Sequence, residues 1–355
     1  MVCTVLESPN VRSKEPWVRQ YDHEVQGATH IKPFGGATTS GPNDSGVVWL
    51  YPHGGDKESA VSIGCGLAPR LSLHDPYLMA QYAVDEAIRN VVATGGDIDH
   101  TCLLDNFCWP DPIVSEKTPD GDYKLGQLVR CCAGLYDICM QYGTPLVSGK
   151  DSMKNDFRGK NGRGEPRVIS ILPTLLVTAM SKTTMGATQT SAWKQAGDHI
   201  YLLGSLTQGL KGTEWAEHFV MEEGFDSLPP IDLEQNHALY RTIFQANRQK
   251  VFSSIHDVSD GGVICALIES GFGNMLGCSV ELDSSVGVLF CEGNGRFVVS
   301  VSPQNDARFK ELFSDVPHHK LGVTTQRPHV VCAHQQIPYF DVSLNELFTH
   351  WTKEL

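Results

Sequence analysis

The chain has 355 residues, of which 41% are hydrophobic, and a formal net charge of -13 from 28 Lys and Arg against 41 Asp and Glu. This length exceeds the size at which one hydrophobic core usually keeps growing, so it predicts a soluble globular protein of two domains. The excess of negative charge argues against nucleic acid and anionic membranes as partners, because both repel an acidic surface.

The cysteines and the apolar runs indicate a cytoplasmic protein. The eleven cysteines are an odd number, and no pair has the C-x-x-C spacing of zinc or redox sites. Reduced thiols buried in the interior are typical of the cytosol. The first seven residues lack the basic start and apolar core of a signal peptide. The longest apolar stretch, residues 168–180, contains Pro173 and is too short to span a bilayer.

Two irregular segments and a loop open the chain. Residues 1–16 are polar and predict a loosely held lead-in, and residues 17–26 predict an extended segment. Residues 33–46 predict a loop rich in glycine and proline that ends at Asn43-Asp44-Ser45-Gly46. Asp44 is therefore expected at the mouth of the strand that follows.

Strands and helices are then predicted in alternation up to residue 180. Runs rich in β-branched residues favour strands, and apolar residues at helical spacing favour helices. The predicted strands span 47–51, 60–66, 100–107, 145–148 and 168–180, and the predicted helices span 77–93 and 123–142. Residues 149–152, Gly-Lys-Asp-Ser, predict a plain turn; the alternative, a phosphate-binding loop, lacks its upstream glycine. A polar loop is expected at 154–167.

A boundary near residues 181–198 divides the chain into domains of residues 1–182 and 183–355. The second domain again mixes strands and helices, so the fold class is α/β (α+β). Its predicted strands span 199–204, 251–255, 279–281, 288–291, 296–301 and 329–333, and its predicted helices span 236–250, 262–271 and 305–313.

The run Ile-His-Asp-Val-Ser-Asp-Gly-Gly at 255–262 concentrates the most chemistry, between a predicted strand and a predicted helix. Unpaired N–H groups and the helix dipole favour an anion there, and the two glycines leave room for a phosphate. Asp257 repels that phosphate unless a cation lies between them. The alternative is an ordinary helix start in which Ser259 or Asp260 caps the first turn. His256 is interpreted as a structural hydrogen-bonding residue.

Four residues offer the oxygen ligands that Mg²⁺ accepts together with substrate phosphates: Asp44, Glu86, Asn90 and Asp257. Asp44 and Asp257 stand at strand ends. Glu86 and Asn90 lie four residues apart on one face of a predicted helix, which also suits a plain solvated stripe.

Five runs of the sequence resemble phosphoribosylformylglycinamidine synthase. Their order and spacing match the second half of the synthetase part of that enzyme, and the similarity covers nearly the whole chain. The runs are QYDH (20–23), VDEAIRNVV (84–92), LLDNFCWPDP (103–112), GTPLVSGKDS (143–152) and HDVSDGG (256–262).

The resemblance implies the two-domain aminoimidazole ribonucleotide synthase-like architecture, in which the N-terminal domain forms a shared β-barrel on dimerisation. It implies Mg²⁺ and ATP or ADP as cofactors. By this resemblance the metal ligands would be Asp44, Glu86, Asn90 and Asp257, and Ser259 would contact a phosphate of the nucleotide. The phosphate of formylglycinamide ribonucleotide would be faced by Tyr21 and His23.

The family's catalytic half carries a Ser-His-Asn-His-Pro segment that this sequence lacks, so no catalytic residue is assigned. The implied function is ATP-dependent conversion of formylglycinamide ribonucleotide to the amidine in purine biosynthesis, a ligase reaction. The implied partners are a second copy or a complementary first-half synthase subunit, with a glutaminase subunit. Two alternatives stay open: a non-catalytic homodimer that binds Mg-nucleotide, and a self-sufficient ATP-dependent enzyme of the same superfamily with another substrate.

Overall fold

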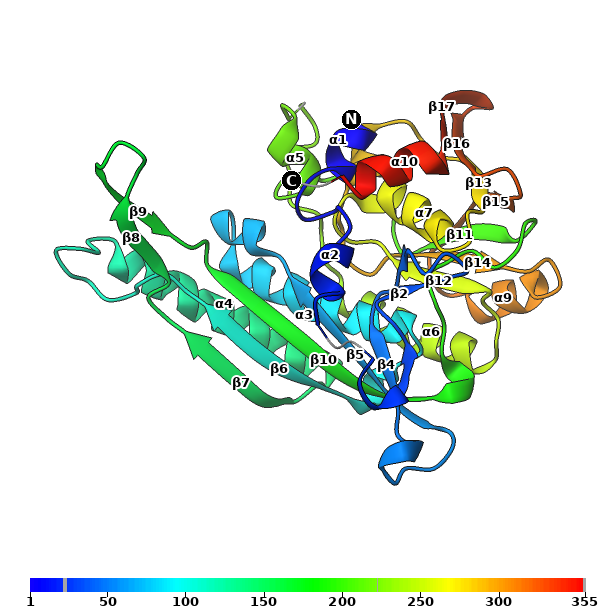
Figure 1. The fold of residues 1–355 in the computed structure, drawn as a ribbon, viewed down its shortest axis with the longest axis horizontal. Helices are drawn as coiled ribbons and strands as arrows, with labels where there is room; N and C mark the ends of the chain where they lie inside the picture. Colours follow the sequence, from blue (N-terminus) through cyan, green and yellow to red (C-terminus); the bar gives the residue numbers. More distant parts are fainter. Residues whose placement is uncertain (22–23, 222, 354–355) are drawn as a thin grey trace. The chain divides into compact units, whose positions relative to one another are not determined.

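A computed structural model describes residues 1–21, 24–221 and 223–353 of the chain (Figure 1). It divides into two compact units: unit 1 comprises Met1–Ile63, Arg89–Ile98 and Ser181–Leu355, and unit 2 comprises Gly64–Ile88 and Asp99–Met180. The elements β5 (Ser59–Leu67), α3 (Pro76–Ala93) and β10 (Thr174–Thr184) each contribute residues to both units. The domain boundary expected between residues 182 and 183 stays a prediction.

Unit 1 is built on a seven-stranded sheet with the order β12-β14-β11-β15-β13-β16-β17. Neighbouring strands are antiparallel except for the parallel pair β13 and β16. The strands are β11 (His199–Leu203), β12 (Ser254–Asp257), β13 (Gly277–Glu281), β14 (Phe297–Val301), β15 (His318–Thr325), β16 (His329–His334) and β17 (Ile337–Ser343). The helices that follow residue 200 are α5 (Glu214–His218), α6 (Leu233–Arg248), α7 (Gly262–Phe272), α8 (Val286–Phe290), α9 (Asp306–Leu312) and α10 (Leu344–Trp351).

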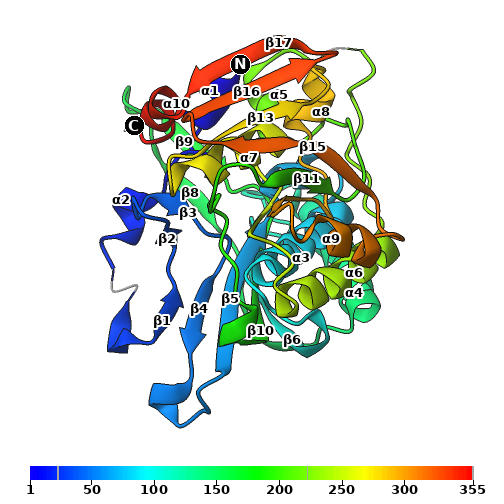
Figure 2. The same cartoon turned by 90° about the vertical axis from the view of Figure 1, so that its right-hand side faces the viewer.

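Helices cover both faces of this sheet, as Figure 2 shows for α7 on one side and α6 and α9 on the other. Side chains alternate between the faces of a strand. In β11, Ile200 and Leu202 enter the core that α7 lines, whereas Tyr201 stacks on Phe309 of α9 with ring centroids 4.3 Å apart. The alternation therefore explains why residues 200–203 of β11 are buried on both faces of the sheet.

The N-terminal segment of unit 1 departs from its sequence-based expectation. Instead of a loose lead-in, residues 1–16 contain α1 (Val2–Leu6) and the start of α2 (Glu15–Val18). Val5 and Leu6 are fully buried in the main core, because their apolar side chains pack with α7 and α10. The extended segment expected at 17–26 is also wrong for the described residues, which include the end of α2 and a 3-10 helix, η1 (Val25–Gly27).

Short strands follow η1. They are β1 (Thr29–Ile31), β2 (Phe34–Gly35), β3 (Gly41–Pro42) and β4 (Gly46–Trp49), with the 3-10 helix η2 (Tyr51–His53) before β5. In unit 1, β1 pairs with β4 and β4 pairs with β5, both antiparallel. The predicted strands at 47–51 and 60–66 are thus confirmed. A small core of Ile31, Val47 and Ala60 holds these strands together.

Unit 2 contains the neighbouring strands β10, β6 (Thr101–Cys108) and β7 (Leu146–Ser152), with β6 and β7 parallel. The long helix α4 (Gly121–Tyr142) packs against α3, where the hydroxyl of Tyr142 donates a 2.6 Å hydrogen bond to buried Asp85. Both predicted helices of the first half are therefore confirmed. The remaining 3-10 helices are η3 (Pro69–Leu73), η4 (Ile98–His100) and η5 (Met185–Ala187).

Several local predictions in the chain are wrong. Residues 149–152 continue β7 rather than form a turn, because they pair in register with β6. The loop expected at 154–167 is instead a hairpin of β8 (Asp156–Lys160) and β9 (Pro166–Ser170). The strand expected at 168–180 is present but interrupted at residues 171–173, so it falls partly in β9 and partly in β10. The strand expected at 288–291 is helix α8, since the Ser285 side chain accepts the Val288 N–H and starts a helical turn.

Candidate functional site

Two carboxylate side chains and one imidazole side chain meet in unit 1. Asp44, His256 and Asp257 each place a potential ligand atom within 4.8 Å of the others. His256 Nδ1 lies 2.5 Å from Asp44 Oδ1, and His256 Nε2 lies 3.1 Å from Glu269 Oε2. The Asp257 backbone N–H donates to the second Asp44 oxygen at 3.4 Å. The cluster thus joins the loop before β4 to the end of β12 and to α7.

The loop that carries Asp44 is held against the end of α7. A Cβ atom on Gly36, whose φ is +79°, would lie 2.1 Å from the carbonyl oxygen of Gly273, so this contact requires glycine. The Thr38 N–H also donates to that carbonyl at 3.1 Å, and the Ala37 N–H donates to the Asn274 side chain at 2.8 Å. The glycines of the loop therefore allow the close packing that brings Asp44 to β12.

His256 and Asp257 end strand β12, which lies at the edge of the sheet and pairs with β14. The chain then turns into α7, where the N-cap residue is Gly261 rather than the expected Ser259 or Asp260. Glu292 Oε1 accepts the Gly261 N–H at 2.8 Å. Glycine is favoured at this N-cap because its φ is +83°, a conformation that residues with a Cβ rarely adopt.

Gly262 is required by the turn into α7 and by close packing. Its φ is +72°, and a Cβ atom there would lie 2.7 Å from the carbonyl oxygen of Leu289. The missing side chain therefore makes room for the backbone of α8. Both glycines are required by backbone conformation and packing, whether or not a phosphate binds.

The charges of the cluster shift one another. Burial by itself lowers the pKa of His256, but the charge and hydrogen bond of Asp44, followed by Glu269, raise it well above its ordinary value. The imidazolium then donates from both ring nitrogens. Burial and the charge of Asp44 raise the pKa of Asp257 to about 7, against the opposing charges of Arg89 and His256.

Arg89 completes the surroundings of Asp257. Its Nη2 lies 3.5 Å from Asp257 Oδ2, and its Nη1 donates to Asn294 Oδ1 at 2.8 Å. Asp257 Oδ2 is buried and accepts no hydrogen bond from the described part of the chain. A buried carboxylate oxygen without a hydrogen bond is costly, so this atom is suited to a ligand that the protein itself does not supply.

The donor set fits a hard divalent cation. Mg²⁺ prefers oxygen ligands, and the Asp44 and Asp257 carboxylates supply them from buried or half-buried positions. The His256 nitrogens are instead engaged by Asp44 and Glu269, so His256 orients a ligand rather than acting as one. A cation between the carboxylates would also relieve their mutual repulsion.

The structure places the other expected site residues as follows. Asn90 belongs to unit 1 and is half-buried, whereas Glu86 belongs to unit 2, where its Oε2 accepts the Leu67 N–H at 2.9 Å. Ser259 is half-buried two residues before the N-cap of α7. The side chain of Tyr21 is 76% exposed. His23 lies outside the described residues.

Sequence reasoning missed three residues that surround the cluster: Arg89, Glu269 and Asn294. Arg89 stands next to Asn90 within the run at 84–92, but a buried arginine in an apolar helix face gives no sign of its partner. Glu269 follows His256 by 13 residues, a spacing with no local meaning. Their roles depend on contacts between distant segments.

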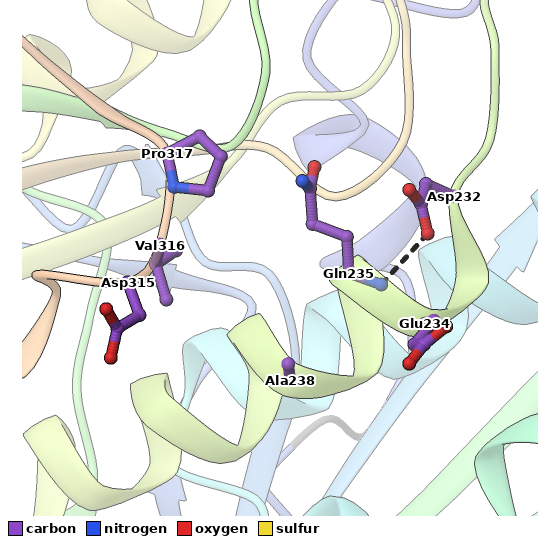
Figure 3. A pocket seen from close by; sticks show the side chains of 7 residues that line it. All are labelled: Asp232, Glu234, Gln235, Ala238, Asp315, Val316 and Pro317. Carbon is purple, nitrogen blue, oxygen red and sulfur yellow. Dashed lines mark hydrogen bonds between the residues drawn. The ribbon is translucent and has the colours of Figure 1, made fainter.

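A pocket of about 280 Å³ lies elsewhere in unit 1, and Figure 3 shows its lining. Three of its seven lining residues are acidic, namely Asp232, Glu234 and Asp315. Asp232 also accepts the Gln235 N–H at 3.0 Å and so caps α6. None of the expected site residues lines this pocket, and its carboxylates disfavour a phosphate.

Two α/β domains, with an acidic cluster at a strand end and a glycine-flanked helix start, define the class of the protein. The model for the N-terminal domain of AIR synthase related proteins matches residues 42–170, and the model for the C-terminal domain matches residues 195–335. The chain belongs to this family, and the expected two-domain fold is confirmed.

Within the family, the chain is similar to PurL, a subunit of phosphoribosylformylglycinamidine synthase. It is 33% identical to the subunit of Leuconostoc mesenteroides over 329 residues, which is 91% of this chain and 40% of the relative. It is 34% identical to that of a Nocardioides species over 360 residues, 99% of this chain and 42% of the relative. The chain thus spans about two fifths of the length of these relatives.

Solved structures share the fold. The structure of Thermotoga maritima PurL complexed with FGAR has a TM-score of 0.70 at 18% identity, covering 100% of this chain and 54% of that chain. A chain of the crystal structure of a HypE-HypF complex has a TM-score of 0.58 at 13% identity, covering 85% of this chain and 93% of that one.

Proposed function

We propose that this chain is the second half of the synthetase part of a phosphoribosylformylglycinamidine synthase. It would take part in the ATP-dependent conversion of formylglycinamide ribonucleotide to the amidine in purine biosynthesis. The observation that carries the proposal is the cluster of Asp44, His256 and Asp257 at the start of α7, in a chain similar to PurL over nearly its whole length. The Thermotoga relative has been solved with FGAR and with ATP.

Asp44, Glu86, Asn90 and Asp257 are the proposed ligands of Mg²⁺. The ion, when bound, neutralises phosphate charge and holds the nucleotide in place. Asp44 is oriented by His256, whose imidazolium is itself fixed by Glu269. This arrangement leaves Asp44 one preferred direction, so the cation site is formed before the ligand arrives.

Ser259 is the proposed contact to a nucleotide phosphate, since it precedes the helix N-terminus of α7 and its hydroxyl can donate to an anion. The nucleotide is ATP or ADP. Tyr21 and His23 are proposed to face the substrate phosphate, and the 76% exposure of Tyr21 is compatible with a ligand or partner surface. No side chain of this chain is assigned a catalytic role.

The proposed partners are a complementary first-half synthase subunit or a second copy of the chain, and a glutaminase subunit that supplies ammonia. A structure of PurLQS from Thermotoga maritima is similar to this chain, with a TM-score of 0.62, and supports a complex of several subunits. The proposed location is the cytoplasm, which suits the eleven free thiols. Within the described residues, no helix has the length and apolar character to cross a membrane.

The purified chain tests the proposal in two assays. In the first, calorimetry measures binding of ADP with and without Mg²⁺. We expect Mg²⁺ to increase the affinity for ADP in wild type and to have no effect on it in Asp257→Asn. In the second, ATP turnover with formylglycinamide ribonucleotide and ammonia is absent from the chain alone and appears when a first-half synthase subunit is added. Turnover by the chain alone would refute the need for a partner half. Magnesium-dependent nucleotide binding without turnover under any combination would favour a non-catalytic homodimer.

A further inference from the structure

One arginine of the N-terminal segment is buried without an anionic partner. Arg12 is 6% exposed, its Nε makes no hydrogen bond, and no ion pair joins its guanidinium to a carboxylate of the described residues. Ser8, whose carbonyl accepts the Arg12 N–H at 3.0 Å, is also buried with an Oγ that makes no hydrogen bond. Two unsatisfied polar groups thus lie one turn apart in the chain.

The protein does not compensate this charge by itself. A guanidinium stays protonated at every relevant pH and cannot escape the cost of burial by losing its proton. The ring of Trp17 lies 5.7 Å from the guanidinium carbon of Arg12. Attraction to a ring face is weaker than the desolvation cost of a buried cation, so the ring offsets only part of that cost. Buried charges are nearly always paired, and Arg12 is expected to have an anion as its partner.

The segment that carries Arg12 lies beside the start of α7. Asn10 Nδ2 donates to Glu214 Oε2 at 3.1 Å, and the Glu214 N–H donates to Glu292 Oε1 at 2.8 Å. The same Glu292 oxygen accepts the N–H of Gly261, the N-cap of α7. Two glutamates therefore connect Asn10 to the helix N-terminus, and Val5 of α1 packs against the same glycine.

A second cation of the segment, Lys14, lies near the same helix end. Its ammonium donates to the backbone carbonyls of Asn10 and Arg12, at 2.9 and 2.6 Å, and forms no ion pair with a carboxylate among the described residues. Burial lowers the pKa of Lys14, and the charge of Asp260, one residue before the N-cap, opposes that shift. The charges of Glu269 and Glu214 act on the ammonium in the same direction as Asp260. A phosphate there would have to gain more from the two cations than it loses to these carboxylates.

We propose that Arg12 and Lys14, with the N-terminus of α7, bind a phosphate group. The inference rests on the proposed function, because it adds a phosphate subsite to the same helix start. A guanidinium offers paired N–H donors that match two oxygens of a phosphate, and an ammonium adds a point charge. The phosphate belongs either to the nucleotide or to the phosphorylated substrate; both present the same dianionic group.

The test uses the full chain in EDTA, with inorganic phosphate, ribose 5-phosphate and ADP as separate probes in calorimetry. We expect saturable binding of at least one probe, with Kd raised at least tenfold by Arg12→Met and by Lys14→Met. Arg19→Met is the matched control, since Arg19 is on the same segment, exposed and paired with Glu15 at 2.5 Å; its Kd should stay within twofold. If Arg12→Met does not fold, Lys14→Met carries the test.

The probes also identify the source of the phosphate. Loss of ADP binding in both variants assigns the subsite to the nucleotide, and loss of ribose 5-phosphate binding with ADP unchanged assigns it to the substrate. Equal Kd values for wild type and both variants, or no binding of any probe to wild type, would overturn the inference. Asp257→Asn separates the two proposals, because it should remove magnesium-dependent ADP binding and leave phosphate binding in EDTA intact.

Discussion

Asp257→Asn gives the sharpest test of the cation site, because asparagine keeps the shape of the side chain and removes its charge. Burial and Asp44 raise the pKa of Asp257 from 3.8 to about 7 in the folded protein. The folded state therefore keeps this proton to higher pH than the unfolded state does. Its stability falls as the pH rises from about 4 to about 7, by about 1.4 kcal/mol per pH unit.

The accumulated cost above pH 7 is roughly 4 kcal/mol, and the neutral asparagine side chain of the variant would not incur it. Without metal, the variant should be clearly more stable than wild type at pH 8.5 and nearly equal to it at pH 5. Urea unfolding in EDTA measures both differences.

Magnesium and nucleotide should narrow the stability difference between the two proteins at pH 8.5. Binding at one hundred times Kd stabilises a folded protein by about 2.7 kcal/mol. Wild type should gain this amount from Mg-ADP, and the Asp257→Asn variant should gain no more than it gains from ADP in EDTA. A variant that is equally destabilised at pH 5 and pH 8.5, or that gains as much from Mg-ADP as wild type does, would refute the reasoning that Asp257 is a buried carboxylate awaiting a cation.

Three further predictions concern the framework. Burial by itself raises the pKa of Asp306, but hydrogen bonds from a lysine, a tyrosine and a histidine hold it well below its ordinary value. These bonds stabilise the folded state by about 2 kcal/mol above about pH 4, and this stabilisation is lost as the pH falls through the folded-state pKa. Asp306→Asn should therefore flatten the acid branch of a plot of urea midpoint against pH. Tyr142→Phe leaves a buried aspartate without one donor and should cost about 2 kcal/mol in urea unfolding. Gly262→Ala should lower the Tm sharply, with a cost of several kcal/mol, because φ is +72° and a Cβ would overlap backbone at 2.7 Å.

The first prediction has a contradicting outcome, and the other two have matched controls. An acid branch of the same slope in wild type and Asp306→Asn would contradict the first. Tyr77→Phe removes an exposed hydroxyl–carboxylate bond of the same 2.6 Å length and should cost well below 1 kcal/mol; a cost equal to that of Tyr142→Phe would show that burial does not decide the effect. Gly126→Ala in α4, with nothing within 4 Å of the added Cβ, should stabilise by up to about 1 kcal/mol.

His256 illustrates how far a sequence-based interpretation reaches. A histidine at a strand end was expected to be a structural hydrogen-bonding residue, and it does bond on both sides, to Asp44 and Glu269. The sequence could not show that His256 contacts the proposed metal ligand Asp44, because the two residues are 212 positions apart. That contact makes His256 a positioning residue of the proposed cation site.

The sequence by itself determined the elements whose signal is local. The helices α3 and α4 follow from apolar residues at helical spacing, and the change from β12 to α7 follows from a buried strand, two glycines and an apolar helix. These predictions succeeded because backbone preference and side-chain pattern agree within a few residues. The candidate ligands Asp44 and Asp257 were recognised from strand ends together with the family resemblance.

Tertiary structure alone decided which of these groups meet and in what state. A carboxylate on a loop before β4 reaches β12 only because Gly36 packs against the end of α7. The pKa of Asp257 near 7 depends on burial and on Asp44, and the unpaired charge of Arg12 depends on the fold of a segment that was expected to be loose. Desolvation and long-range packing set these properties, and neither can be predicted from a short segment of the sequence.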